Sequence, residues 1–118
     1  MSWFFRNNRD EEDPIIKIKR DEVRRLEHSC DVLQQMLFNA EKSRDALIEK
    51  IAAEETQIAE NSEDSDVGFT KRAALIGQKE EHKAALEVIN DRVVALEDAY
   101  CALSAHINTI RADYFGHS

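Results

Sequence analysis

The sequence is poor in the residues that make turns and sheets. Of its 118 residues only three are glycine and one is proline, while 34% are charged. A sheet protein needs many more turns, so this composition predicts long helices with few connections. Aromatic residues make up only 7% of the chain, which argues against a thick globular core. A chain of this length forms at most one domain.

Other shortages restrict the class of protein. No apolar run approaches the roughly 20 residues that cross a bilayer. No charged segment followed by an apolar one opens the chain, so we expect no secretory signal. The formal net charge is −8, and we expect no nucleic-acid partner, because phosphate binding needs a basic surface. Two cysteines without metal-ligand spacing fit a reducing, cytoplasmic compartment.

Motifs for catalysis and metal binding are lacking too. The sequence contains no glycine-rich phosphate loop, no cysteine pair at metal spacing and no His-Glu-x-x-His. Its four histidines are scattered, and His82 falls within a helical apolar pattern, which favours a packed histidine over a ligand or base. The many carboxylates lie on predicted solvated surfaces without a pocket. We therefore expect a protein that is not an enzyme and uses no metal or cofactor.

What the sequence does have is a long heptad pattern. Two segments carry apolar residues at alternating steps of three and four, which is the a/d seam of a coiled coil. The first seam runs through Ile16, Lys19, Val23, Leu26, Cys30, Leu33, Leu37, Ala40, Arg44, Leu47, Ile51, Glu54 and Ile58. The second seam runs through Leu75, Lys79, His82, Leu86, Ile89, Val93, Leu96, Tyr100, Leu103, Ile107, Ile110 and Tyr114.

A short polar stretch between the two seams predicts that they fold back on each other. We expect an all-α fold, a long antiparallel two-helix coiled-coil hairpin over residues 14–115. Its helices should span about 14–60 and about 69–114, joined by a turn at about 61–68. A short N-terminal tail with an acidic link occupies residues 1–13. Asp13-Pro14 fits the start of the first helix, because aspartate caps free amides and proline suits the first helical position.

The seams also predict how the helices pair. If facing residues have numbers that sum to 133, every a position meets a d position. Cys30 then meets Leu103, Leu26 meets Ile107, and Ile51 meets His82. Glu54 meets Lys79 in this register, and we predict these two as the register pair. A slipped register would place each of these charges against an apolar side chain, which penalises slippage.

The N-terminal tail predicts a membrane contact. Its candidate membrane-contact residues are Trp3, Phe4, Phe5, Arg6 and Arg9. Aromatic rings beside cations suit the headgroup region of an anionic membrane. The antiparallel pairing would bring this tail to the same end as the basic residues of the first helix and Tyr114-Phe115. The same composition also fits a frayed tail, or aromatic rings that pack back onto the hairpin.

Apolar residues outside the seams predict association. The candidate interaction surface consists of Met36, Phe38, Ile48, Val88, Ala95 and Ala99. Two helices alone would leave these residues in water, and contiguous exposed apolar surface commonly marks an association site. We therefore expect self-association of hairpins. The alternative is a scatter of single exposed apolar residues, which is ordinary in soluble proteins.

Short motifs resemble one family. Arg72-Ala73-Ala74-Leu75-Ile76, followed by Gln78-Lys79, resembles the opening of the second hairpin helix in the phage-shock protein A family, bacterial relatives of ESCRT-III. Glu12-Asp13-Pro14 resembles the entry into that family's first helix, and Trp3–Arg6 is similar in kind to its membrane-binding N-terminus. The resemblance spans nearly all of this chain but only the hairpin portion of a family member. It implies a peripheral protein on the cytoplasmic face of the membrane that supports membrane integrity under stress. It also implies a regulatory partner such as an AAA+ ATPase.

Two functions therefore stay open. The first is a self-associating hairpin of the phage-shock type that binds anionic lipids at the membrane surface. The second is a soluble coiled-coil adaptor or regulatory hairpin that offers its off-seam apolar residues to a protein partner.

Overall fold

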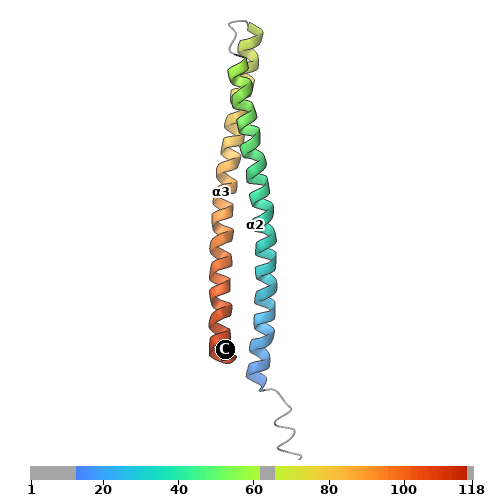
Figure 1. Cartoon of the computed structure of the whole chain (residues 1–118), viewed down its shortest axis with the longest axis vertical. Coiled ribbons are helices and arrows are strands. Elements are labelled where there is room, and N and C mark those ends of the chain that lie inside the picture. The colour runs from blue at the N-terminus through green and yellow to red at the C-terminus, as the bar shows by residue number, and fades with distance from the viewer. Residues whose placement is uncertain (1–12, 62–65, 117–118) are drawn as a thin grey trace, which may run out of the picture. The chain divides into compact units, whose positions relative to one another are not determined.

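The fold is an all-α helical hairpin (Figure 1). A computed structural model describes residues 13–61 and 66–116 of the chain. These residues form two α-helices, α2 over Pro14–Glu60 and α3 over Asp66–Tyr114. The described ranges contain no strand. The prediction of an all-α helical hairpin is thus confirmed.

The hairpin divides into two compact units. The first unit comprises the chain up to Gln34 and from Asp98 onward, and the second comprises Gln35–Glu97. In each unit a segment of α2 lies beside an antiparallel segment of α3 (Figure 1). The first unit therefore holds the start of α2 and the end of α3, and the second holds the end of α2 and the start of α3.

Both ends of α2 are fixed by side-chain caps. At its start, the backbone N–H of Ile15 donates to Oδ1 of Asp13 at 2.8 Å, as the Asp13-Pro14 pair predicts. At its end, the N–H of Asn61 donates to the carbonyl of Gln57 at 3.0 Å, and the Asn61 side-chain amide donates to the same oxygen at 2.7 Å. The predicted span of about 14–60 is the span that the structure has.

α3 begins three residues earlier than the predicted start at about 69, because its first turn also packs. Gly68 lies seven residues before Leu75 and is buried, so the seam continues into this turn. Packing of a seam position outweighs the roughly 1 kcal/mol by which glycine disfavours a helix. At the other end, the Phe115 N–H donates to the Arg111 carbonyl at 2.9 Å. Gly116 then adopts a left-handed φ of 72°, the usual way for a glycine to end a helix.

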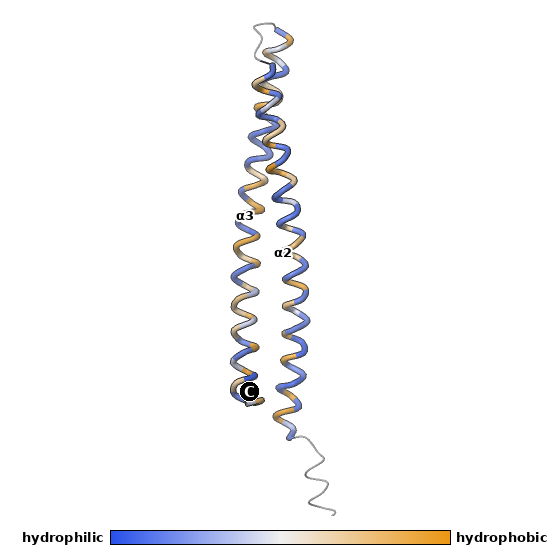
Figure 2. Tube along the Cα trace, viewed as in Figure 1, coloured by the Kyte–Doolittle hydropathy of each residue, from blue (hydrophilic) through white to orange (hydrophobic). Residues whose placement is uncertain are grey.

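The seams supply the core of each unit. In the first unit, four buried residues form a cluster with three partly buried neighbours: Val23, Cys30, Ile107 and Ile110, packed with Leu26, Tyr100 and Leu103. This cluster contains the predicted neighbours Cys30/Leu103 and Leu26/Ile107. In the second unit, the buried apolar residues are Ala40, Val93 and Leu96. Along both helices, apolar positions recur between polar ones, as a one-sided seam requires (Figure 2).

One exposed glycine inside α3 offers a test of helix stability. We expect Gly77→Ala to raise the free energy of unfolding by about 0.5–1 kcal/mol, because alanine is the better helix former. A Cβ at Gly77 would meet no atom within 4 Å, so no strain opposes the gain. Urea unfolding followed by circular dichroism measures the change. Gly116→Ala is the matched control and should destabilise the chain, since its φ of 72° disfavours a side chain. A Gly77→Ala variant less stable than the parent would contradict this account.

Candidate functional site

The most buried charged side chain belongs to a polar layer in the second unit. Glu54 is only 7% exposed, and Nδ1 of His82 lies 2.9 Å from each of its carboxylate oxygens. Beside this pair, Nζ of Lys79 lies 3.6 Å from Oε1 of Glu55. The predicted register pair of Glu54 with Lys79 is therefore wrong, because each of these two residues binds a different partner. His82 binds Glu54, and Lys79 binds the neighbouring Glu55.

The tilt of helical side chains explains this exchange of partners. The Cα–Cβ bond of a helical residue points toward the N-terminus of its own helix. In an antiparallel pair, Glu54 therefore leans toward the level of His82, while His82 leans toward the level of Glu54. Lys79 leans away from Glu54, toward the connection, and its flexible stem reaches the more exposed Glu55. The seam positions themselves were predicted correctly, and His82 is the packed histidine that the sequence indicated.

The six residues of the candidate interaction surface are all exposed, but they do not share one side. Met36 and Phe38 are two residues apart, which places them about 200° apart around α2. Met36 borders a shallow hollow of about 260 Å³ in the second unit, together with Ser43 and Arg92. Phe38 is 57% exposed, and the Lys42 ammonium lies 5.4 Å from the centre of its ring.

The remaining members lie on both helices. Ile48 is on α2 and is 48% exposed, whereas Val88 is on α3 and is 68% exposed. Ala95 lies seven residues after Val88, so the two share one side of α3 in the second unit. Ala99 is also exposed but belongs to the first unit. The predicted surface is thus a set of exposed positions, of which Val88 and Ala95 lie on the same side of α3, two helical turns apart.

The candidate membrane-contact residues, Trp3, Phe4, Phe5, Arg6 and Arg9, lie outside the described residues. In the sequence, the acidic link at residues 10–13 separates them from the start of α2 at Pro14. The site that these residues adjoin is the first unit, where a hollow of about 540 Å³ opens between α2 and α3. We call it the arginine hollow. Its walls include three arginines and three apolar residues: Arg20, Arg24, Arg111, Val23, Ala112 and Phe115.

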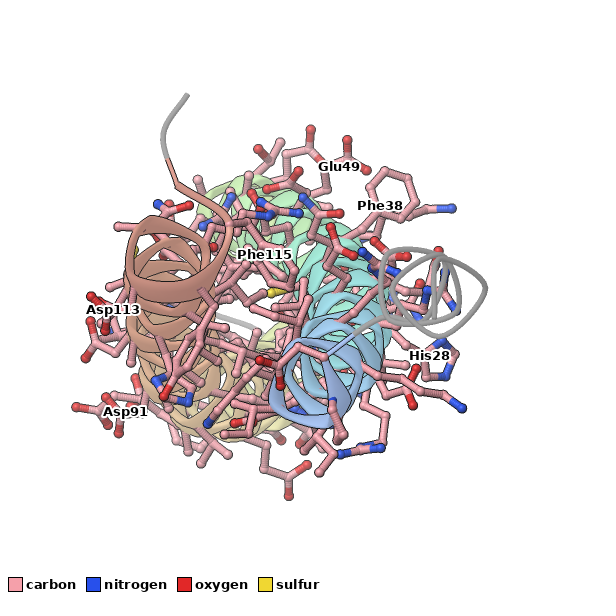
Figure 3. The ribbon with its side chains drawn as sticks, turned by 90° about the horizontal axis from the view of Figure 1, so that it is seen from below. His28, Phe38, Glu49, Asp91, Asp113 and Phe115 are labelled. Carbon is pink, nitrogen blue, oxygen red and sulfur yellow. The ribbon has the colours of Figure 1, made fainter. Side chains whose placement is uncertain are left out.

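Two cross-helix contacts shape the arginine hollow. Arg111 on α3 donates a hydrogen bond to the Glu27 carboxylate on α2. The Arg20 guanidinium carbon lies 5.9 Å from the centre of the Phe115 ring, within the range of a cation–π contact. Seen from the ends of the chain, Phe115 lies over the space between the helices, whereas Asp113 and His28 point outward (Figure 3). The helix end at Phe115-Gly116 therefore closes one side of the hollow with an aromatic ring.

Sequence reasoning found part of this site. The sequence predicted that the basic residues of the first helix, which include Arg20 and Arg24, share one end of the hairpin with Phe115, but it did not indicate Arg111 or Ala112. The available signal was the pairing of Glu27 with Arg111, since both flank the seam at equivalent heptad positions and carry opposite charges. Nearby, Nζ of Lys19 lies 3.2 Å from Glu22 and 5.1 Å from the centre of the Tyr114 ring.

The described residues also bear on thiol chemistry, metal binding and membrane crossing. Cys30 is buried in the seam and Cys101 is exposed, and each is a free thiol, with the orientations that their seam positions predicted. Among residues 13–61 and 66–116 there is no group of three or more His, Cys, Asp or Glu side chains that could hold a metal ion. No helix in these ranges is long and apolar enough to cross a bilayer.

The polar layer makes a testable contribution to stability. We expect His82→Leu to lower the free energy of unfolding by about 1–3 kcal/mol, because it leaves the buried Glu54 carboxylate without its hydrogen-bond donor. The double variant Glu54→Leu/His82→Leu should recover that loss or exceed the parent, because a continuous apolar seam needs no desolvated charge. Chemical unfolding of the four members of the cycle gives the coupling energy. Additive effects of the two substitutions would show that the pair is not coupled.

Comparison with known proteins gives no relative on which to place these sites. No family model, no curated protein and no solved structure matches the chain. The architecture is therefore established by the structure of this chain, and a function has to be argued from its surfaces.

Proposed function

We propose that this chain is a non-catalytic coiled-coil hairpin that self-associates and acts at the cytoplasmic surface of the membrane. Its role there would be in membrane maintenance or stress response, as in the phage-shock protein A family that its sequence resembles. Anionic lipids are its proposed ligands, and a regulatory protein such as an AAA+ ATPase is a proposed partner.

One observation carries this proposal. The arginine hollow and the start of α2 gather cations and aromatic rings beside the point where the aromatic N-terminal tail joins the hairpin. Arg20 and Arg24 line the hollow with Phe115, and the adjoining tail contributes three aromatic residues and two arginines. Each cation near an anionic membrane surface contributes about 1 kcal/mol of attraction, which compensates locally for the net charge of −8.

The lipid role predicts a dependence on the tail. Replacing Trp3, Phe4 and Phe5 together with serine should weaken binding to anionic vesicles more than about tenfold, because burying one such side chain contributes about 1.5–3 kcal/mol. Co-sedimentation with phosphatidylglycerol-containing vesicles measures the binding, and vesicles of phosphatidylcholine alone test its charge dependence. Raising the salt concentration from about 0.1 M to about 1 M should also weaken it, since the screening length falls from about 10 Å to about 3 Å.

The control for this experiment removes apolar surface elsewhere. Phe38, Val67 and Phe69 are 57%, 73% and 73% exposed, and their joint replacement by serine should leave vesicle binding unchanged. If the tail variant pellets with vesicles as well as the parent does, the proposed lipid contact is wrong.

A second function, a soluble adaptor that binds a protein partner, is supported by the apolar surface of α3. Val88 is 68% exposed, on a helix whose seam is already occupied. Exposed apolar side chains of this size favour contact with another helix. Self-association would cover the same surface, so both functions place Val88 and Ala95 in an interface.

Self-association through this patch can be measured directly. We expect Val88→Lys to lower the average mass in solution, because it places an ammonium group in the interface and desolvates it. Val94→Lys is the matched control, since Val94 lies about 120° around α3 from Val88. Light scattering coupled to size-exclusion chromatography gives the masses. A parent chain that stays monomeric over the whole concentration range, or equal effects of both substitutions, would contradict the assignment of this patch.

A further inference from the structure

We infer that the arginine hollow is the docking site of the chain's own N-terminal tail, with the aromatic rings of Trp3–Phe5 seated among its arginines. The hollow offers two kinds of surface. Val23, Ala112 and Phe115 provide an apolar lining, and the charged residues Arg20, Arg24, Arg111 and Glu27 line the hollow as well. Aromatic rings fit both, because they bury on apolar carbon and stack against guanidinium planes.

The size of the hollow suits such an occupant. Its volume is about 540 Å³ and it is open to solvent, so a side chain of the tail can enter it from outside. The contact of Arg20 with the Phe115 ring at 5.9 Å shows the kind of interaction that a second ring would repeat. The hollow lies entirely within the first unit.

The charges of the tail match those of the arginine hollow. Asp10, Glu11 and Glu12 stand between the aromatic residues and the start of α2. These carboxylates carry the charge opposite to that of Arg24, a cation that α2 contributes to the hollow. The cations of the tail, Arg6 and Arg9, would face water in the docked state.

The tether is long enough. Asp13 follows Trp3 by ten residue steps, and an extended chain of that length reaches about 33–36 Å. Along α2, the distance from Asp13 to Arg24 is about 16 Å at 1.5 Å per residue. The extended tail is therefore longer than the distance from Asp13 to the hollow, so Trp3 can reach it. A short tether holds its end at an effective concentration in the millimolar range, so even a weak contact would be occupied.

If the tail docks, the arginine hollow and the membrane compete for the same aromatic side chains. The same three aromatic side chains cannot sit in the arginine hollow and in a lipid headgroup layer at once. This consequence rests on the proposed membrane function, whereas docking itself does not. In the docked state the hairpin would shield its aromatic residues from water, and vesicles would have to displace them.

Trp3 is the only tryptophan of the chain, so its fluorescence reports on the tail of the full-length protein without a label. In lipid-free buffer we expect Trp3 emission to be blue-shifted relative to the urea-unfolded chain. Quenching by acrylamide should be reduced by about twofold or more, because a millimolar effective concentration keeps at least half of a site with millimolar affinity occupied. Both signals should be independent of protein concentration, and protection that is lost on dilution would overturn the inference in favour of contacts between chains.

Two substitutions should release the tail. Ala112→Glu fills the hollow with a longer, acidic side chain at an exposed helical position, and Phe115→Ala removes its aromatic wall. Each should restore the quenching of the unfolded reference, while Phe69→Ala, at an exposed phenylalanine of the second unit, should not. Circular dichroism confirms that the variants stay helical. A Trp3 that is fully quenched in the parent, or unaffected by both substitutions, would overturn the inference.

Vesicles separate this inference from the proposed function. If both hold, Ala112→Gln, which fills the hollow without adding a charge, should bind anionic vesicles about twofold more tightly, because the tail no longer has to leave a hollow that it occupies half of the time. Exposed Trp3 together with tight vesicle binding would refute docking and leave the membrane function standing. Protected Trp3 with no response to vesicles would refute the membrane function and support docking.

Discussion

The packing of one apolar seam against another is the interaction on which the rest of this structure depends. A pair of helices offers no second layer, so even Ile110, the least exposed residue of the described core, keeps 4% of its surface in contact with solvent. Stability must therefore come from many seam positions that each contribute moderately, and each unit has its own share of them. The same thin core leaves the outer sides of both helices uncovered. Any binding by this chain must therefore use side chains on its surface.

The thin seam also explains how a charged residue can sit within it. Glu54 is as buried as Val23, at 7% exposed each, yet His82 supplies a hydrogen bond across the helices. Such a layer contributes less to stability than leucine would. It instead fixes the register of α2 against α3, because a slip of one turn would separate the Glu54 carboxylate from its His82 donor. Arg111 and Glu27 repeat the principle at the edge of the first unit, where solvent reduces the energy of the ion pair.

The sequence was sufficient for the fold because the heptad pattern is long and the turn signals are few. Every seam residue predicted from Ile16 to Ile58 is buried or partly buried, and on α3 only Tyr114 is exposed. The partner of Glu54 could not be read from the pattern, because it depends on the tilt of side chains along antiparallel helices. The start of α3 was missed because Gly68 usually marks a turn, and here packing decides. The arginine hollow depends on the left-handed Gly116 and the placement of the Phe115 ring, which no periodicity encodes.

The two thiols have a consequence of a different kind. Cys101 faces solvent and Cys30 lies in the seam, so the chain carries an accessible sulfur and a protected one on opposite helices of the same unit. A thiol reagent would modify Cys101 at once, and it would reach Cys30 only during the moments when the first unit opens. The rate at which Cys30 is modified therefore measures how often the two helices of the first unit separate. Mass spectrometry can follow this rate in the unmutated chain.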